Sequence, residues 1–326
     1  MPPRSLRRIR IEGVAERGSV RILTGFDFQG GPSMTVVRAT DIQRVAVIGT
    51  GTMGCGIAQV AGTAGYQVRL FDEKPDLAEA AVDRVRRMLD KSAAGGTMTQ
   101  EEAREAKSRL EASRTLEEAA ARADLVVEAI PEDLSLKETL FAKLGGICRA
   151  SALLASNTSS LSLTRIARAV SHPERVLGLH FFNPPHRMKL VEVVRGGETS
   201  DAALESALGA VRRMGKEAIV VRDSPGFATS RLGVALGLEA MRMLEEGVAR
   251  PEDIDKAMEL GYGHPMGPLR VSDLVGLDVR LSIAQTLHSE LGAAHFAPPR
   301  ILVDKVREGK LGKKSGEGFY RWDSEG

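Results

Sequence analysis

The stretch GLHFFNPPHRMKLVEVV, residues 178–194, places one titratable side chain in each of two apolar runs. His180 lies in the first run and Glu192 in the second, with two prolines between the runs. Burying an unpaired carboxylate in a strand is costly, so we expect the two side chains to face each other. A histidine held by a carboxylate is a general base with its orienting acid. For an isolated pair, the alternative is a buried hydrogen bond with no chemical role.

A glycine-rich turn follows the first well-patterned apolar run of the chain. The run RVAVIG predicts a buried strand, and the turn that opens the next helix consists of Gly49, Thr50, Gly51, Thr52, Met53 and Gly54. In this G-x-G-x-x-G pattern the first glycine permits a tight turn, the second admits a pyrophosphate, and the third lets helix and strand pack closely. The helix amino terminus then offers free N–H groups to the phosphates.

Asp72 stands 23 residues after Gly49, where the next predicted strand ends. An acid at this point accepts hydrogen bonds from a ribose 2′-hydroxyl. The 2′-phosphate of NADP would meet the carboxylates of Asp72 and Glu73, so the predicted cofactor is NAD.

Strands alternate with helices as far as residue 222, which predicts an α/β fold with a Rossmann-type doubly wound sheet. Two of its helices are expected over 75–94 and 99–113. After DSPGF, residues 223–227, only helices are expected, over 228–246, 251–260, 269–291 and 299–308. The predicted parts are a poorly ordered basic extension (1–40), an NAD-binding domain carrying the histidine (41–222), and an all-helical substrate and dimerisation domain (223–326).

Charge and composition exclude several classes of partner. Residues 1–40 carry seven arginines against three acids, and the rest of the chain sums to about −2, so no nucleic-acid partner is expected. No apolar run reaches the ~20 residues of a membrane span. Cys55 and Cys148 fit neither a metal site nor a disulfide framework, so we expect no metal and a cytoplasmic location. The apolar helices over 228–246 and 269–291 favour a homodimer through the helical domain.

Three further motifs accompany the glycine turn: SNTSSL (156–161), HFFNP (180–184) and the DSPGF segment. With them, residues from about 42 to 322 resemble the L-3-hydroxyacyl-CoA dehydrogenases. The resemblance implies an NAD-dependent oxidoreductase that converts a 3-hydroxyacyl-CoA into the 3-oxoacyl-CoA, or the reverse. His180 would act as general base or acid, Glu192 would orient it, and Ser159 would hydrogen-bond the substrate oxygen.

The same matching places four more residues at cofactor-contacting positions: Glu132, Lys137, Asn183 and Lys314. Each has a simpler interpretation as a solvated surface group, and that interpretation is strongest for the two lysines. For Ser159 the alternative is a serine that stabilises a turn or caps a helix.

Ser230 departs from the family pattern, which has an asparagine at this point of PGFATSRL to hold the substrate near the histidine. Serine is shorter and lacks the paired donor and acceptor of an amide. We therefore expect either reduced activity on ordinary 3-hydroxyacyl-CoA or a shifted substrate, and Ser230→Asn tests this.

The helix after Asp72 carries four basic residues, Arg84, Arg86, Arg87 and Lys91, whose offsets do not match the CoA contacts of the family cleanly. A solvated helix face is the simpler interpretation of such mixed charges. A thioester on an acyl carrier protein therefore stays open as an alternative to free acyl-CoA. A non-thioester 3-hydroxy acid also stays open as the substrate, and Ser230 leaves open a catalytically weakened NAD-binding homologue.

Overall fold

The computed structural model describes residues 38 and 41–322. The basic extension expected over 1–40 lies outside these described residues, apart from Arg38. None of the described helices is long and apolar enough to cross a membrane.

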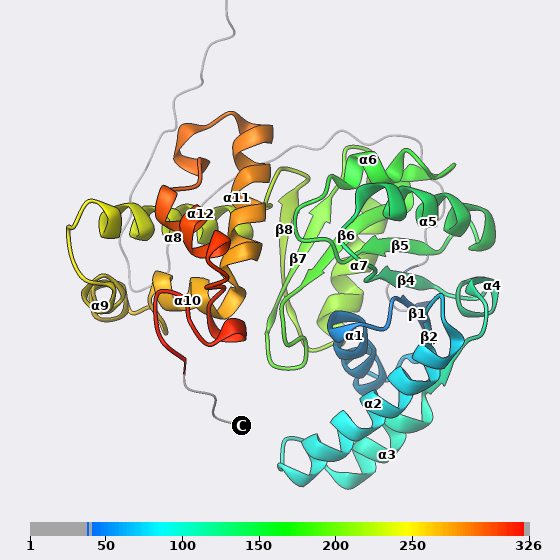
Figure 1. Cartoon of the computed structure of the whole chain (residues 1–326). Coiled ribbons are helices and arrows are strands. Elements are labelled where there is room, and N and C mark those ends of the chain that lie inside the picture. The colour runs from blue at the N-terminus through cyan, green and yellow to red at the C-terminus, as the bar shows by residue number, and fades with distance from the viewer. Residues whose placement is uncertain (1–37, 39–40, 323–326) are drawn as a thin grey trace, which may run out of the picture. The chain divides into compact units, whose positions relative to one another are not determined.

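An eight-stranded sheet forms the frame of the first part of the chain (Figure 1), in the order β3-β2-β1-β4-β5-β6-β7-β8. Its strands are β1 (Arg44–Ile48), β2 (Gln67–Phe71), β3 (Leu110–Ala112), β4 (Leu125–Glu128), β5 (Leu153–Ser156), β6 (Val176–Phe181), β7 (Leu190–Arg195) and β8 (Glu217–Arg222). The first six strands are parallel, and the antiparallel pairing of β6 with β7 reverses the last two. The strand order switches direction between β1 and β4, and in such sheets ligands bind at this point beyond the carboxyl ends of the strands. The predicted doubly wound fold is confirmed.

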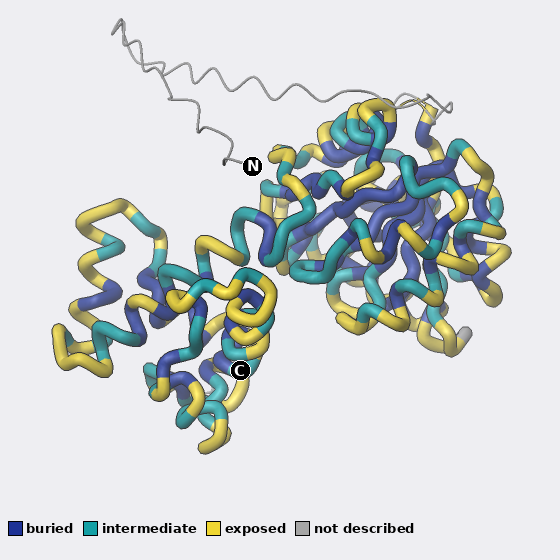
Figure 2. Tube along the Cα trace, turned by 90° about the horizontal axis from the view of Figure 1, so that it is seen from above, coloured by how far each residue is buried: buried dark blue, intermediate teal, exposed yellow. Residues whose placement is uncertain are grey.

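Helices cover both faces of the sheet because its strands are apolar on both sides. On β1, Val45 and Val47 belong to one core cluster, and Ala46 and Ile48 belong to the other. The first face is covered by α1 (Thr52–Thr63), α2 (Pro75–Ala94), α3 (Gln100–Ser108) and α7 (Asp201–Arg213). The second is covered by α4 (Leu116–Ala120), α5 (Leu134–Ile147) and α6 (Leu163–Ala167). Figure 2 shows the strands as the most continuously buried part of the chain.

The helix expected over 99–113 is too long. Thr99 and Glu102 form a reciprocal capping box at its start, but α3 ends at Ser108. The following residues form β3, which pairs in parallel with β2. A three-residue edge strand is too short to show a period in the sequence, so its pairing partner decides its structure.

Five α-helices form the remainder of the described chain: α8 (Thr229–Glu245), α9 (Pro251–Tyr262), α10 (Pro268–Val275), α11 (Leu277–Leu291) and α12 (Arg300–Arg307). They share a core that includes Val234, Leu238, Leu269 and Leu277. The single helix expected over 269–291 is wrong, because Gly276 has φ of 101° and separates α10 from α11. Helical periodicity continues across this glycine, so the apolar pattern alone does not reveal the break.

A buried carboxylate hydrogen-bonds the C-terminal residues 319–322 to these helices. Asp273, in α10, is 1% exposed and accepts hydrogen bonds from the backbone N–H groups of Phe319 and Tyr320 and from the indole of Trp322. This arrangement holds the C-terminal residues 319–322 against α10.

Candidate active site

The glycine turn between β1 and α1 has the backbone that a bound pyrophosphate requires. Gly49 has φ of 99°, and its N–H donates to the Phe71 carbonyl at the end of β2. A Cβ on Gly54 would lie 1.9 Å from the Gly49 oxygen, so only glycine fits there. A Cβ on Gly51, at the amino terminus of α1, would have no atom within 4 Å. Gly51 therefore borders open space, where phosphates could approach free N–H groups.

Asp72 follows β2 directly and holds this turn. Its Oδ2 accepts hydrogen bonds from the backbone N–H of Thr50 at 2.9 Å and from the Thr50 hydroxyl at 2.7 Å. Arg84 of α2 is exposed, but its guanidinium reaches the Thr50 carbonyl and donates to it at 3.4 Å. Arg84 thus supports the turn, whereas Arg86 forms an exposed ion pair with Asp83, as the solvated-face interpretation predicts.

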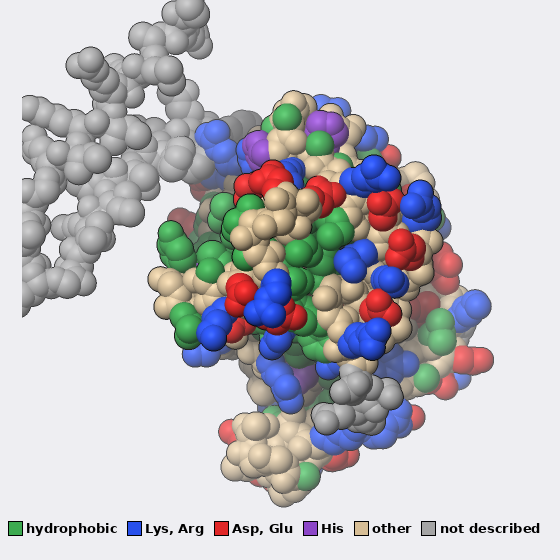
Figure 3. Space-filling view, turned by 60° about the vertical axis from the view of Figure 1, so that its left-hand side comes forward, with side chains coloured by type: hydrophobic (Ala, Val, Ile, Leu, Met, Phe, Trp, Pro, Cys, Tyr) green, Lys and Arg blue, Asp and Glu red, His purple; other side chains and the backbone are tan. Residues whose placement is uncertain are grey.

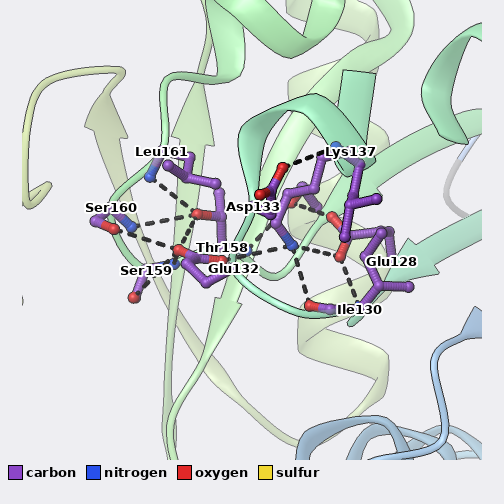
Figure 4. A network of polar contacts seen from close by, with 11 residues as sticks. Glu128, Ile130, Glu132, Asp133, Lys137, Thr158, Ser159, Ser160 and Leu161 are labelled. Carbon is purple, nitrogen blue, oxygen red and sulfur yellow. Dashed lines mark hydrogen bonds and ion pairs between the residues drawn. The ribbon is translucent and has the colours of Figure 1, made fainter. Parts of the chain in front are cut away.

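Lys137 lies at the centre of a polar network between β4 and α5 (Figure 4). Its ammonium is 2.5 Å from Glu128 Oε1 and 3.5 Å from Glu132 Oε2, and it donates to the Ile130 carbonyl. Lys137 and Glu128 are both almost fully buried, so each side chain offsets the cost of burying the other. The surface interpretation of Lys137 is therefore wrong.

Glu132 connects this network to the SNTSSL loop. Its Oε1 accepts hydrogen bonds from the Thr158 hydroxyl at 2.5 Å and from the Ser159 N–H at 3.1 Å, and the Ser159 hydroxyl is 3.5 Å away (Figure 4). The helix that follows is capped by Ser162, whose hydroxyl accepts from Arg165 N–H. The capping role considered for Ser159 thus belongs to Ser162, and the half-buried Ser159 is positioned by the Glu132 carboxylate.

His180 and Glu192 face each other, as the sequence predicts. They are register partners in the antiparallel pair β6–β7, and His180 Nδ1 lies 2.7 Å from Glu192 Oε2. Glu192 is fully buried and His180 is 7% exposed. Because Nδ1 is engaged by the carboxylate, Nε2 is the nitrogen left to exchange a proton with a ligand.

The amino terminus of α8 also binds Glu192. Oε1 accepts from the N–H groups of Ala228 at 3.2 Å and Thr229 at 2.9 Å, and Oε2 accepts from the Thr229 hydroxyl at 3.0 Å. Burial alone would raise the pKa of Glu192, but the hydrogen bonds from His180 and Thr229 outweigh it, and the pKa is lowered. The carboxylate therefore stays ionised beside the imidazole.

Thr229 is a site residue that the sequence reasoning missed. A hydroxyl at the first position of a helix directly after a glycine-containing turn was the available signal. The aromatic rings of Phe182 and Phe227 lie 4.5 Å and 6.0 Å from the imidazole, centroid to centroid, and give it a partly apolar surrounding.

Comparison with known proteins connects this geometry to a family. A family model described as 3-hydroxyacyl-CoA dehydrogenase, NAD binding domain, matches residues 44–224, and one for the C-terminal domain of the same family matches residues 226–322. The chain belongs to the 3-hydroxyacyl-CoA dehydrogenase family. The resemblance to this family, the oxidoreductase class and the NAD cofactor are thereby confirmed.

Individual relatives of the 3-hydroxyacyl-CoA dehydrogenase family cover nearly the same residues. A probable 3-hydroxybutyryl-CoA dehydrogenase of Bacillus subtilis is 45% identical over 87% of this chain and 98% of its own. A 3-hydroxyadipyl-CoA dehydrogenase of Escherichia coli is 42% identical over 87% of this chain and 60% of its own. The crystal structure of (S)-3-hydroxybutyryl-CoA dehydrogenase from Ralstonia eutropha is 36% identical, covers 87% of this chain and all of its own, and superposes with a TM-score of 0.84.

The structure places the remaining residues matched to the family in different surroundings. Ser230 is half-buried in the first turn of α8, next to Thr229. Asn183 is exposed in the loop between β6 and β7. Lys314 forms an ion pair with Asp278 at 2.5 Å in the helical part, so its described contacts do not bring it to the nucleotide turn.

A basic hollow of about 770 Å³ lies beside the α1 and α2 helices. Lys91, His186, Arg187, Arg213 and Lys216 are among its lining residues. Arg213 already donates a hydrogen bond to the Ile42 carbonyl, and Lys216 donates to two backbone carbonyls. Burial, together with the charges of Arg187 and Lys216, lowers the pKa of His186. The positive charge of the hollow suits an anionic ligand.

Proposed function

We propose that this chain interconverts a 3-hydroxyacyl-CoA and its 3-oxoacyl-CoA with NAD, and that His180 is the general base in the oxidation. The observation that carries this proposal is the 2.7 Å contact between His180 Nδ1 and a fully buried Glu192, itself held by the amino terminus of α8. Such a pair can take a proton at Nε2 and stabilise the resulting imidazolium.

NAD would be held by the glycine turn, with its pyrophosphate at Gly51, and when bound it accepts the hydride that leaves C3. Open space at Gly51 and the carboxylate of Asp72 at the end of β2 support this placement. Glu132 and Lys137 line the same carboxyl edge of the sheet, between β4 and α5. The protein's own task is then to orient the alcohol and to remove its proton.

Ser159 would hydrogen-bond the C3 oxygen of the substrate. Its backbone N–H and its hydroxyl both lie beside Glu132 Oε1, and the carboxylate is in turn 3.5 Å from the Lys137 ammonium. The backbone N–H holds Ser159 in place, and the hydroxyl contact to Glu132 is long, so its one proton can turn to an oxygen that gains negative charge as the 3-oxo group is reduced.

The basic hollow favours CoA over a carrier protein as the group that presents the acyl chain. Lys91 and Arg187 could pair with the phosphates of a CoA nucleotide, and the neutral His186 could donate a hydrogen bond to one of them. Arg187→Ala should raise KM for acetoacetyl-CoA about tenfold and leave KM for the N-acetylcysteamine thioester, which has no nucleotide, unchanged. Turnover of an acyl carrier protein thioester but not of the CoA ester would favour the carrier alternative.

A homodimer through the helical segment is the proposed assembly. Large apolar side chains are exposed on these helices: Leu232, Leu260, Tyr262, Leu274, Val275, Val279 and Val303. Figure 3, with this side turned forward, shows hydrophobic side chains gathered together and charged ones around them. Such patches mark protein interfaces. Light scattering should give twice the 35.0 kDa chain mass, and a monomer at micromolar concentration would contradict the assignment.

The activity is tested by mixing the protein with acetoacetyl-CoA and NADH and following nicotinamide absorbance. We expect oxidation of NADH that His180→Ala abolishes without changing NADH affinity. Tight NADH binding with no turnover of any 3-oxoacyl-CoA would instead support a non-catalytic nucleotide-binding role.

A further inference from the structure

Arg280 is a buried arginine with no described partner. It lies on α11 and is 7% exposed. Within residues 38 and 41–322 its guanidinium makes no hydrogen bond or ion pair, and its Nε is wholly enclosed. Burial lowers its pKa to about 10, which still leaves it charged at neutral pH. A buried N–H without an acceptor is costly, and the two terminal nitrogens, which are not enclosed in the same way, keep donors free for a ligand oxygen.

The guanidinium lies against the first turns of α8. Arg280 Nη1 is 3.5 Å from the position that a Cβ on Gly233 would occupy. The same face of α11 carries Leu287, whose Cδ2 is 2.8 Å from a Cβ built on Gly226, just before α8. α8 and α11 therefore pack against each other. Along α8, Arg280 lies at Gly233, about one helical turn after Thr229, whose N–H binds Glu192.

Ser230 lies one helical turn before Gly233, the α8 residue that Arg280 approaches. It precedes Gly233 by three residues, and side chains with this spacing are neighbours on a helix surface, with Cβ atoms about 5–6 Å apart. An arginine carries five donors on a long side chain, whereas serine carries one short hydroxyl. From this spacing we infer that the long, unpaired donor group of Arg280 and the short hydroxyl of Ser230 are neighbours on α8.

We propose that Arg280 hydrogen-bonds the thioester carbonyl oxygen of the bound 3-hydroxyacyl-CoA, in place of the amide that Ser230 does not provide. This inference rests on the proposed function and names a substrate-binding residue for it. It also replaces the expectation that Ser230 weakens the enzyme or shifts its substrate: the polar contact is retained but comes from α11.

The test is a double-mutant cycle with Arg280→Met and Ser230→Asn, assayed with acetoacetyl-CoA and NADH. Arg280→Met should lower kcat/KM about 10- to 100-fold, because one charge-assisted contact is lost. Ser230→Asn alone should change kcat/KM less than about threefold, yet in the Arg280→Met background it should recover about tenfold. Equal effects of Ser230→Asn in both backgrounds would overturn the proposal.

Stability separates this role from a structural one. Because Arg280 has no described partner, Arg280→Met should melt at the same temperature as the wild type or higher. NADH affinity and the oligomeric mass should not change. A lower melting temperature or an altered mass, with kcat/KM unchanged, would assign Arg280 to folding or to a subunit contact. Arg300→Met, at a side chain that is 89% exposed, is the matched control.

The proposed function and this inference fail in different ways. If the wild type turns over no 3-oxoacyl-CoA, the proposed function fails. If the wild type is active and folded Arg280→Met is equally active, only the role of Arg280 fails. Arg280→Lys keeps the charge but not the planar fork, so it should recover part of the loss.

Discussion

Glu192 stands directly opposite His180 across the β6–β7 pair and is also the acceptor that anchors the first turn of α8. One carboxylate therefore orients the imidazole and receives the free N–H groups where the helical segment begins. The positive end of a helix favours an anion at this position. The pair is consequently sensitive to changes in α8 as well as in the sheet.

Glu192→Gln should reduce kcat by on the order of 10³-fold, because a neutral amide cannot stabilise the imidazolium that forms at His180. Steady-state kinetics measure this effect. NADH affinity should stay as in the wild type, since the glycine turn is untouched; a parallel loss of NADH binding would point to misfolding instead.

The lowered pKa of Glu192 makes part of the folding stability dependent on pH. A carboxyl whose pKa is lower when folded than its ordinary value of 4.5 contributes stability that is fully present above pH 4.5. That contribution is lost as pH falls through the folded pKa. The melting-temperature difference between wild type and Glu192→Gln should therefore shrink as pH is lowered from 7 to below 4. A difference that grows toward acid would mean that the pKa is raised.

Thr229 should matter through Glu192 although it carries no proton in the reaction. Thr229→Val keeps the shape and the backbone N–H but removes the hydroxyl bond to Oε2. We expect kcat to fall about 3- to 30-fold, in line with one hydrogen bond to a charged group. Thr229→Ser, which keeps the hydroxyl, should stay within about twofold of the wild type. Equal losses in both variants would show that packing at this position dominates.

Lys137 should be required for stability because it neutralises Glu128. Lys137→Met leaves a fully buried carboxylate without its cation, which costs about 3–5 kcal/mol of unfolding free energy. Urea unfolding measures the loss. Lys143→Met, on the exposed side of α5, is the matched control and should change stability by less than about 0.5 kcal/mol. Adding Glu128→Gln to Lys137→Met should restore part of the loss; if it adds to the loss, the two residues do not act as a pair.

The sequence predicted most of the sheet because each buried strand is a short apolar run that ends in a turn signal. It also predicted that His180 and Glu192 would meet, since two charged residues in adjacent apolar arms need each other. What it could not predict depends on contacts between distant segments. β3 exists because β2 offers a free edge, and the division between α10 and α11 depends on the conformation of Gly276.

Contacts between distant segments also decide parts of the candidate site that the sequence could not predict. Lys137 looks like any surface lysine of an amphipathic helix until the structure places it beside Glu128, nine residues earlier. Nothing local marks Arg280 as a neighbour of Gly233, which lies in another helix. Packing between elements brings such pairs together, so no regular spacing in the sequence predicts them.

Two glycine-to-alanine substitutions in the glycine turn, at Gly51 and Gly54, test nucleotide binding and folding separately. A Cβ on Gly51 would meet no protein atom within 4 Å, so Gly51→Ala should fold with an unchanged melting temperature. The added methyl group would still occupy the space expected for the pyrophosphate, so fluorescence titration should show NADH binding weakened at least tenfold. Gly54→Ala should instead lower the melting temperature, because its Cβ would lie 1.9 Å from the Gly49 oxygen. If Gly51→Ala binds NADH as well as the wild type does, the dinucleotide does not cross the turn at this glycine.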